Sequence, residues 1–177
     1  RRRVTLRTRV VVVQPTFGAM ADPSPWLELT GERGLVLVED AAHAMGATYG
    51  EFVAGRIGHG AFTSLQWSKT ITTGLGGLAR FNDPALRAAF DEIAGEYDEP
   101  SAARQMMIGI LECAHSVLYR PRWASTVQRA YRTLGRFGVV PGSSSTEELD
   151  VAIEPSGYRM RYGRHRGPRL RRALAGL

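Results

Sequence analysis

Four short apolar runs, separated by polar or glycine-rich residues, organise the first half of the chain. They lie at Val10–Val13, Leu35–Val38, Phe62–Leu65 and Gly77–Phe81. The first is an uninterrupted β-branched run, which is typical of a strand buried on both faces of a parallel sheet. Between the first two runs, the pattern predicts a helix that opens at Pro23 and ends near Gly31. The order strand, helix, strand is the unit of a parallel α/β sheet.

The rest of the pattern predicts a hairpin and then helices. The expected segments are a turn-rich hairpin or loop at Tyr49–Gly58, a helix at about Ala85–Ala94, helices at about Ala102–Tyr119 and Arg122–Leu134, and a linker at Gly138–Thr146. Turn and cap residues at Asn82–Asp83–Pro84 precede the first of these helices. The predicted fold class is therefore α/β, with a mainly parallel sheet followed by an all-helical second half.

Length and composition are those of one soluble domain. The chain has 177 residues, of which 44% are hydrophobic, enough for a real core. Cys113 is the single cysteine; it excludes an internal disulfide and is expected to be a small buried side chain. The longest apolar stretch, Met106–Leu118, contains Glu112 and His115 and is too short to cross a bilayer. These features predict a cytoplasmic protein without a membrane span.

The formal charge of +6 raises the competing hypothesis of a basic nucleic-acid-binding protein. Seven arginines lie between Arg159 and Leu177. Tyr158 and Tyr162 are the nearby aromatics, however, and no zinc-ligand or helix-turn-helix pattern accompanies them. We therefore favour a solvated helix face for these arginines, and expect neither a nucleic-acid partner nor a metal site.

Lys69 is the only lysine among 23 lysine and arginine residues. An arginine cannot deprotonate in a protein, whereas a desolvated lysine can become a neutral amine nucleophile. The single lysine could mark a position that arginine cannot fill. The alternative is that an arginine-biased composition left one lysine by chance, and the lysine alone does not decide between the two.

The surroundings of Lys69 favour a chemical role. Asp40 stands at the end of one predicted strand, and Lys69 follows another that contains Ser64 and precedes a glycine-rich turn at Gly74–Gly77. This is the layout of a pyridoxal phosphate (PLP) site. A lysine amine bonds to the cofactor aldehyde, and an aspartate keeps the pyridine nitrogen protonated. Serine hydroxyls and glycine amides can hold a phosphate.

Three motifs carry a resemblance to a known family. They are Val11–Gly18, Val38–Ala47, and Ser64 followed at fixed spacing by Lys69 and Gly74–Gly77. In this order and spacing they resemble the DegT/DnrJ/EryC1/StrS family of PLP-dependent sugar aminotransferases. The close resemblance covers about Thr8 to Arg87, and a weaker one continues to the C-terminus. It implies the large-domain sheet of the aspartate aminotransferase type I fold.

The resemblance also implies roles for four residues. The lysine that matches Lys69 carries the cofactor and is catalytic, and the aspartate that matches Asp40 pairs with the pyridine nitrogen. The residue that matches His43 contacts the ring or its hydroxyl, and the serine that matches Ser64 binds the phosphate. The implied reaction transfers an amino group from an amino acid to a nucleotide-linked keto-sugar, in cell-surface polysaccharide or secondary-metabolite biosynthesis. Family members are homodimers.

Members of the family are about twice as long. We therefore expect residues 1–95 to be part of the PLP-binding large domain and residues 96–177 to be a helical segment with a basic C-terminal stretch, without the small domain. Leu75 stands where the family has an acid, and Arg159 where it often has an asparagine. A catalytically inactive remnant of the family is the alternative, and we expect little turnover from this chain. Lys69 argues against the dehydratase branch, which has histidine at that position.

Overall fold

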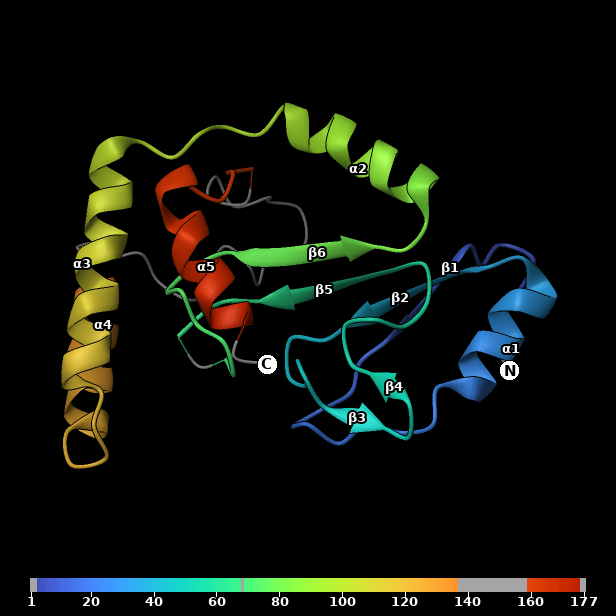
Figure 1. Ribbon diagram of the computed structural model, residues 1–177, viewed down its shortest axis with the longest axis horizontal. Coiled ribbons are helices and arrows are strands. Elements are labelled where there is room, and N and C mark those ends of the chain that lie inside the picture. The colour runs from blue at the N-terminus through green and yellow to red at the C-terminus, as the bar shows by residue number, and fades with distance from the viewer. Residues whose placement is uncertain (1–2, 68, 137–158, 176–177) are drawn as a thin grey trace.

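The computed structural model describes residues 3–67, 69–136 and 159–175. Its centre is a sheet of four strands in the order β1-β2-β5-β6 (Figure 1). The strands are β1 (Val10–Val13), β2 (Val36–Asp40), β5 (Gly60–Ser64) and β6 (Gly77–Phe81). β1, β2 and β5 are parallel, and β6 is antiparallel to β5. The expected α/β fold with a mainly parallel sheet is confirmed.

The direction of β6 follows from its connection to β5. A parallel pair needs a crossover of about a dozen or more residues, usually a helix, to return to the same end of the sheet. The segment between Ser64 and Gly77 contains no helix. It turns back instead, and β6 pairs antiparallel with β5 through Ser64 and Gly77.

The connection from β1 to β2 contains α1 (Ser24–Arg33). A proline in its first turn fits the helical backbone without removing a needed hydrogen bond. The helix continues past Gly31, where the sequence predicted its end. It stops at Gly34, which adopts the left-handed conformation (φ 59°) and donates its N–H to the Gly31 carbonyl. The buried Leu29 faces the sheet side of this helix, which packs against β2.

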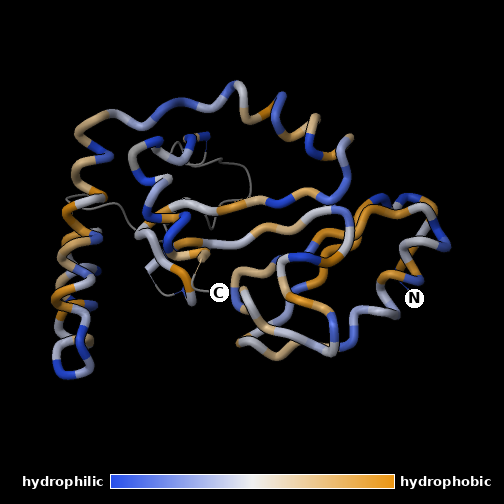
Figure 2. The backbone as a smooth tube through the Cα atoms, viewed as in Figure 1, coloured by the Kyte–Doolittle hydropathy of each residue, from blue (hydrophilic) through white to orange (hydrophobic). Residues whose placement is uncertain are grey.

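β1 differs from the prediction in its burial. Val10 and Val12 are 50% and 60% exposed, whereas Val11 and Val13 are half-buried. The strand is at the edge of the described sheet, and its alternate side chains point to opposite faces. The prediction that both faces are covered is therefore wrong for the described residues. Figure 2 shows how continuous the apolar segments are along β1 and β2.

The core lies between the sheet and the loop that precedes β5. Leu37 is fully buried, and Gly58 packs against it so closely that an added Cβ would lie 2.7 Å from the Leu37 carbonyl oxygen. Gly58 also has φ +71°, so a side chain is excluded twice over. The Leu37 N–H donates to His59 Nδ1 at 3.0 Å. The next inward residue on β2 is Glu39, whose carboxylate is fully buried beneath the same loop.

Glu39 ties that loop to the sheet. Its Oε2 accepts hydrogen bonds from the backbone N–H groups of Gly55 at 2.8 Å and Ile57 at 3.2 Å. Its Oε1 is buried and has no hydrogen-bond partner among the described residues. Burial raises the pKa of Glu39 above its ordinary value, although these hydrogen bonds oppose the shift.

We expect this raised pKa to make folding stability depend on pH. A raised pKa means that the folded state holds the proton longer than the unfolded state. The contribution of Glu39 to stability is therefore present below the unfolded pKa and is lost as the pH rises through the folded pKa. Glu39→Gln keeps the shape and cannot titrate. The melting temperature of the parent relative to Glu39→Gln, measured from pH 4 to 7, should fall; a constant or rising difference would contradict the assignment.

Two predicted elements flank the sheet. The hairpin predicted at Tyr49–Gly58 is present and begins one residue earlier, with β3 (Thr48–Tyr49) antiparallel to β4 (Phe52–Val53). Helix α2 (Pro84–Gly95) begins where it was expected, because Asp83 Oδ1 accepts from the N–H groups of Ala85 and Leu86 at 2.7 and 3.1 Å.

The described part of the second half is mainly helical, as predicted. It comprises α3 (Ala102–Leu118), α4 (Ala124–Arg136), η2 (Arg164–Arg166) and α5 (Gly167–Leu174). α3 and α4 stand at the end of the sheet where β5 finishes (Figure 1). The expected linker at Gly138–Thr146 lies outside the described residues. No helix in the described ranges combines the length and apolar character that crossing a bilayer requires.

Cys113 corrects one expectation. It was predicted to be buried, because Leu111, Ala114 and Val117 surround it in the sequence. On α3 it is exposed, and its sulfur lies 3.6 Å from Arg169 Nη2. Val117 is itself 66% exposed. Apolar neighbours in sequence therefore did not indicate a buried helix face here.

Candidate active site

The candidate residues are positioned by the carboxyl ends of parallel strands. Asp40 is the last residue of β2 and Ser64 the last of β5. Because these strands are neighbours and parallel, with Asp40 in register with Phe62, both ends reach the same edge of the sheet. Ligands of open α/β sheets bind at this edge. Lys69 follows from β5 on the loop that returns to β6.

Asp40 is held by hydrogen bonds to both carboxylate oxygens. Its Oδ2 accepts from Gln14 Nε2 at 2.5 Å, and its Oδ1 accepts from the Ala42 N–H at 3.0 Å. The side chain is half-buried. These contacts orient the carboxylate and leave further lone pairs for a ligand, because an ionised carboxylate can accept about four hydrogen bonds.

Gln14 is a site residue to which the sequence analysis gave no role. The register of β1 and β2 pairs Val13 with Glu39, so the next residues, Gln14 and Asp40, face each other at the same edge. The signal was present in the sequence, since Gln14 directly follows the first apolar run as Asp40 ends the second. Their contact depends on the strand register, which the sequence pattern did not provide.

Lys69 and His43 meet across the edge. Lys69 Nζ lies 3.2 Å from His43 Nε2, within hydrogen-bond distance, although the residues are 26 positions apart. His43 is exposed and Lys69 is half-buried. The ring of Phe17 contacts His43 edge-on, with centroids 5.7 Å apart, and the Gly18 N–H donates to the His43 carbonyl at 2.9 Å. The loop after β1 thus supports the imidazole.

Ser64 lies at the end of its strand, as Asp40 does. It is half-buried, and its Oγ accepts from the Gln66 N–H at 3.4 Å. A hydroxyl that accepts in this way also carries a proton that it can donate. The Lys69 N–H donates to the Gln66 carbonyl at 3.0 Å, so Ser64, Gln66 and Lys69 are linked through one short turn.

The loop that carries Lys69 is closed at its base. The Leu65 N–H donates to the Gly76 carbonyl at 2.9 Å, and the Thr73 N–H donates to the Leu65 carbonyl at 3.1 Å. Gly74 has φ +87°, and an added Cβ would lie 2.7 Å from the Trp67 ring. The tight turn expected at Gly74–Gly77 is present, and at Gly74 both the backbone conformation and the available space require glycine.

Aromatic contacts connect this loop to the helices. Trp67 Nε1 donates to the Tyr131 hydroxyl on α4 at 3.1 Å. The Trp67 ring also packs on His115 of α3, with centroids 4.9 Å apart. Burial lowers the pKa of His115 and raises that of Tyr131, so both side chains favour their neutral forms here.

The C-terminal arginines do not form a simple solvated face. Arg166 is 8% exposed and pairs with the buried Glu112. Arg161 donates to the carbonyls of Ala94 at 3.2 Å and Gly95 at 2.8 Å. The prediction of a solvated helix face is therefore wrong for Arg166. Its contact with Glu112 on another helix buries it, and the local sequence around the arginines does not show that contact. Arg164, two residues earlier, has a side chain that is 83% exposed and fits the prediction.

A metal centre finds no support in the part of the chain that the structure describes. No group of three or more histidine, cysteine, aspartate or glutamate side chains is gathered there in a way that could hold an ion. The chemistry on offer at the sheet edge is instead an amine, an imidazole, a carboxylate and a hydroxyl. They come from Lys69, His43, Asp40 and Ser64.

Residues 1–96 match the sequence profile of the DegT/DnrJ/EryC1/StrS aminotransferase family. A GDP-perosamine synthase from Caulobacter vibrioides is 36% identical over 98 residues, which are 55% of this chain and 26% of that protein. An L-glutamine:2-deoxy-scyllo-inosose aminotransferase from Micromonospora echinospora is 35% identical over 163 residues, 88% of this chain and 37% of that protein. The chain therefore spans between about a quarter and two fifths of the length of these relatives.

Solved structures agree with the fold. The X-ray structure of an aminotransferase from Psychrobacter cryohalolentis matches with a TM-score of 0.50 and 31% identity, covering 52% of this chain and 24% of that one. The match to the Micromonospora relative extends beyond residue 96, into the region where the sequence showed only a weak resemblance. The sequence similarity to the Micromonospora protein thus covers both the sheet and at least part of the helical region that follows it.

Proposed function

Because the chain belongs to the DegT/DnrJ/EryC1/StrS aminotransferase family, we propose that it serves in a PLP-dependent transfer of an amino group to a keto-sugar. The observation that carries the proposal is the meeting of Lys69 and His43, 3.2 Å apart, at the sheet edge where Asp40 is held by two hydrogen bonds. The sheet supplies the framework, and the two segments that follow β2 and β5 supply the reactive groups.

The residues present fit PLP as a cofactor. Asp40 offers an oriented carboxylate for the pyridine nitrogen, and Lys69 offers the one lysine amine in the chain. His43 offers an exposed imidazole beside that amine, suited to the ring or its hydroxyl. Ser64 offers a hydroxyl donor for a phosphate oxygen, and its Oγ accepts from the Gln66 N–H. Lys69, Asp40, His43 and Ser64 are the proposed cofactor-binding residues, with Lys69 also catalytic.

The cofactor, when bound, supplies an aldehyde for an amine and an electron-withdrawing pyridine ring. Asp40 would hold a proton at the pyridine nitrogen, and the contacts from Gln14 and Ala42 would keep its carboxylate aimed there. An ionised acceptor makes this hydrogen bond stronger than a neutral one would. The chain thereby holds the ring in its electron-poor form.

Lys69 would move protons at the reacting carbon once an amino donor has displaced it. Proton transfer by a positioned side chain requires an amine within hydrogen-bond reach of the carbon's proton. His43 Nε2, 3.2 Å from Lys69 Nζ, can accept a proton from the ammonium or donate one to the amine, depending on its tautomer. This contact would keep Lys69 near the site while its amine is free.

The names of the relatives support the substrate class. The Caulobacter protein is a GDP-perosamine synthase, and the Micromonospora protein is named for L-glutamine and 2-deoxy-scyllo-inosose. We propose a nucleotide-linked keto-sugar as acceptor and an amino acid as donor. Residues 1–95 would belong to the PLP-binding large domain, and residues 96–177 would form the helical and basic segment that follows it.

We further propose a cytoplasmic homodimer. Apolar side chains on the described helices support an additional interface, since Met106, Ile110 and Val117 on α3 are each more than 60% exposed. Exposed apolar residues on this scale often mark contact surfaces. The single, unpaired Cys113 fits a reducing compartment.

Reductive trapping tests the proposal. We expect PLP, followed by borohydride reduction, to leave a pyridoxyl group on Lys69, which peptide mapping would locate without competition from other lysines. Prior addition of L-glutamine should lower the yield, because an amino donor competes for the same aldehyde. Modification confined to the N-terminal amine, or insensitivity to L-glutamine, would count against the proposal.

A further inference from the structure

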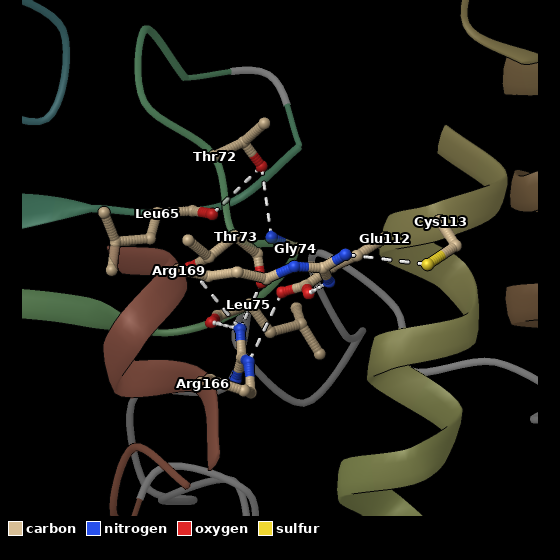
Figure 3. Close-up of polar contacts among 9 residues, drawn as sticks. All are labelled: Leu65, Thr72, Thr73, Gly74, Leu75, Glu112, Cys113, Arg166 and Arg169. Atoms are coloured by element: carbon tan, nitrogen blue, oxygen red, sulfur yellow. Dashed lines mark hydrogen bonds and ion pairs between the residues drawn. The ribbon is translucent and has the colours of Figure 1, made fainter. Parts of the chain in front are cut away.

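Arg166 is a buried cation outside the four candidate residues. Its side chain is 9% exposed, at the end of η2. The guanidinium donates through Nη2 to the Thr73 carbonyl and, at 2.6 Å, to the Leu75 carbonyl (Figure 3). It also lies over the Tyr162 ring, 4.3 Å from the centroid. A buried arginine is costly unless its charge and donors are matched, so this arrangement needs an anion.

Glu112 provides that anion. Its side chain is 8% exposed on α3, and Oε1 lies 3.4 Å from Arg166 Nε. Its other oxygen, Oε2, accepts from Arg169 Nη1 on α5. Removing one partner from such a buried cluster leaves an uncompensated charge. Glu112 on α3 thus binds Arg169 of α5 and Arg166, and Arg166 in turn binds the loop (Figure 3).

The two carbonyls that Arg166 binds belong to the loop of Lys69. Thr73 N–H donates to the Leu65 carbonyl, and the Leu65 N–H donates to the Gly76 carbonyl. Arg166 thus binds the returning half of the loop. Two sets of contacts hold this half: the backbone hydrogen bonds with Leu65 and the hydrogen bonds from the arginine.

We propose that Arg166 is a positioning residue that keeps Lys69 at the cofactor edge by clamping the Thr73–Leu75 turn. The effect of this clamp on cofactor chemistry rests on the proposed function. An arginine suits this task because its planar fork presents several donors in fixed directions, whereas a lysine offers one point charge. Glu112 acts through Arg166, by neutralising its charge and holding its orientation.

The test compares Arg166→Ala, Arg166→Lys and the matched control Arg164→Ala in the full chain. Without cofactor, we expect Arg166→Ala to raise hydrogen exchange at the Thr73 and Leu65 amides at least about tenfold, the scale of one lost hydrogen bond to a charged group. Exchange at the amides of β2 should stay unchanged. Arg164→Ala should resemble the parent, and Arg166→Lys should fall between the two.

The second readout is the rate of pyridoxyl trapping at Lys69 as the PLP concentration is raised. A displaced Lys69 should label more slowly in Arg166→Ala than in the parent, and Arg166→Lys should restore part of the rate. Unchanged loop exchange together with an unchanged labelling rate would overturn the inference. If the parent itself is not labelled at Lys69, the proposed function fails. The exchange data still test whether Arg166 holds the Thr73–Leu75 turn.

A milder variant covers the case in which Arg166→Ala unfolds, which β2 exchange would reveal. Glu112→Gln keeps the size of the side chain and removes its charge. We expect the same loop-specific rise in exchange, because Arg166 then lacks its anion while both loop carbonyls remain. Exchange in Glu112→Gln that rises equally in β2 and the loop would show a general structural role and contradict the clamp.

Discussion

Replacing Lys69 by arginine is expected to abolish reductive incorporation of PLP into the chain apart from its N-terminal amine. The substitution retains the positive charge and most of the side-chain length. It removes the only side-chain amine that can lose its proton, since the guanidinium stays charged in proteins. The effect is therefore a loss of chemistry rather than of packing. Mass spectrometry of the reduced, digested protein measures it.

A relocated lysine provides the matched control. Arg87 lies on the surface of α2, with a side chain that is 69% exposed. In the double variant Lys69→Arg/Arg87→Lys the chain again has one lysine, now on an exposed helix. We expect its labelling to rise linearly with PLP concentration, whereas labelling of Lys69 in the parent should saturate. Equal saturation in both would show that trapping reports only the presence of a lysine.

Asp40→Ala should cause the second-largest loss, in the affinity for PLP. The variant removes a hydrogen bond to a charged group, which contributes about 1.5–3 kcal/mol, or about 10- to 150-fold in affinity. Asp40→Asn keeps the shape of the side chain and the contact with the Ala42 N–H but removes the charge. It therefore distinguishes the effect of the charge from the effect of the side-chain shape. Equilibrium dialysis against PLP gives the dissociation constants.

The order of the three proteins decides the outcome. We expect the parent to bind most tightly, Asp40→Asn to bind more weakly, and Asp40→Ala to bind at least as weakly as Asp40→Asn. Melting temperatures should be compared in parallel, because Asp40 also accepts from Gln14 and so holds β1 to β2. An unchanged affinity for PLP in Asp40→Ala, with the fold intact, would show that Asp40 does not contribute to cofactor binding.

The strands could be placed from the sequence because a short run of consecutive apolar residues, bounded by polar or glycine residues, is typical of a buried strand. The run at Leu35–Val38 overlaps β2 (Val36–Asp40), and the cap at Asp83 places the start of α2. The direction of β6 and the exposure of β1 could not be read in this way. Both depend on which elements lie next to a strand, which is a tertiary property.

The candidate site was predictable in part for the same reason. Strand ends and spacing pointed to Asp40 and Lys69 as residues at one edge. Their supporting residues were not identified. Gln14 needed the strand register, and Arg166 needed a contact that spans 93 positions with Thr73. In a chain where 22 of the 23 basic residues are arginines and Lys69 is the exception, no local pattern distinguishes the buried one.

The position of Trp67 gives the chain a built-in optical reporter. Trp67 is two residues from Lys69, and its indole is hydrogen-bonded to Tyr131 and packed on His115. The other tryptophans, Trp26 and Trp123, are 42% and 61% exposed, so we expect their emission to lie further to the red. Changes on the blue side of the emission should therefore report mainly on the Lys69 loop. Energy transfer from Trp67 to a chromophore on Lys69 would show occupancy of the site in real time, without any label added to the protein.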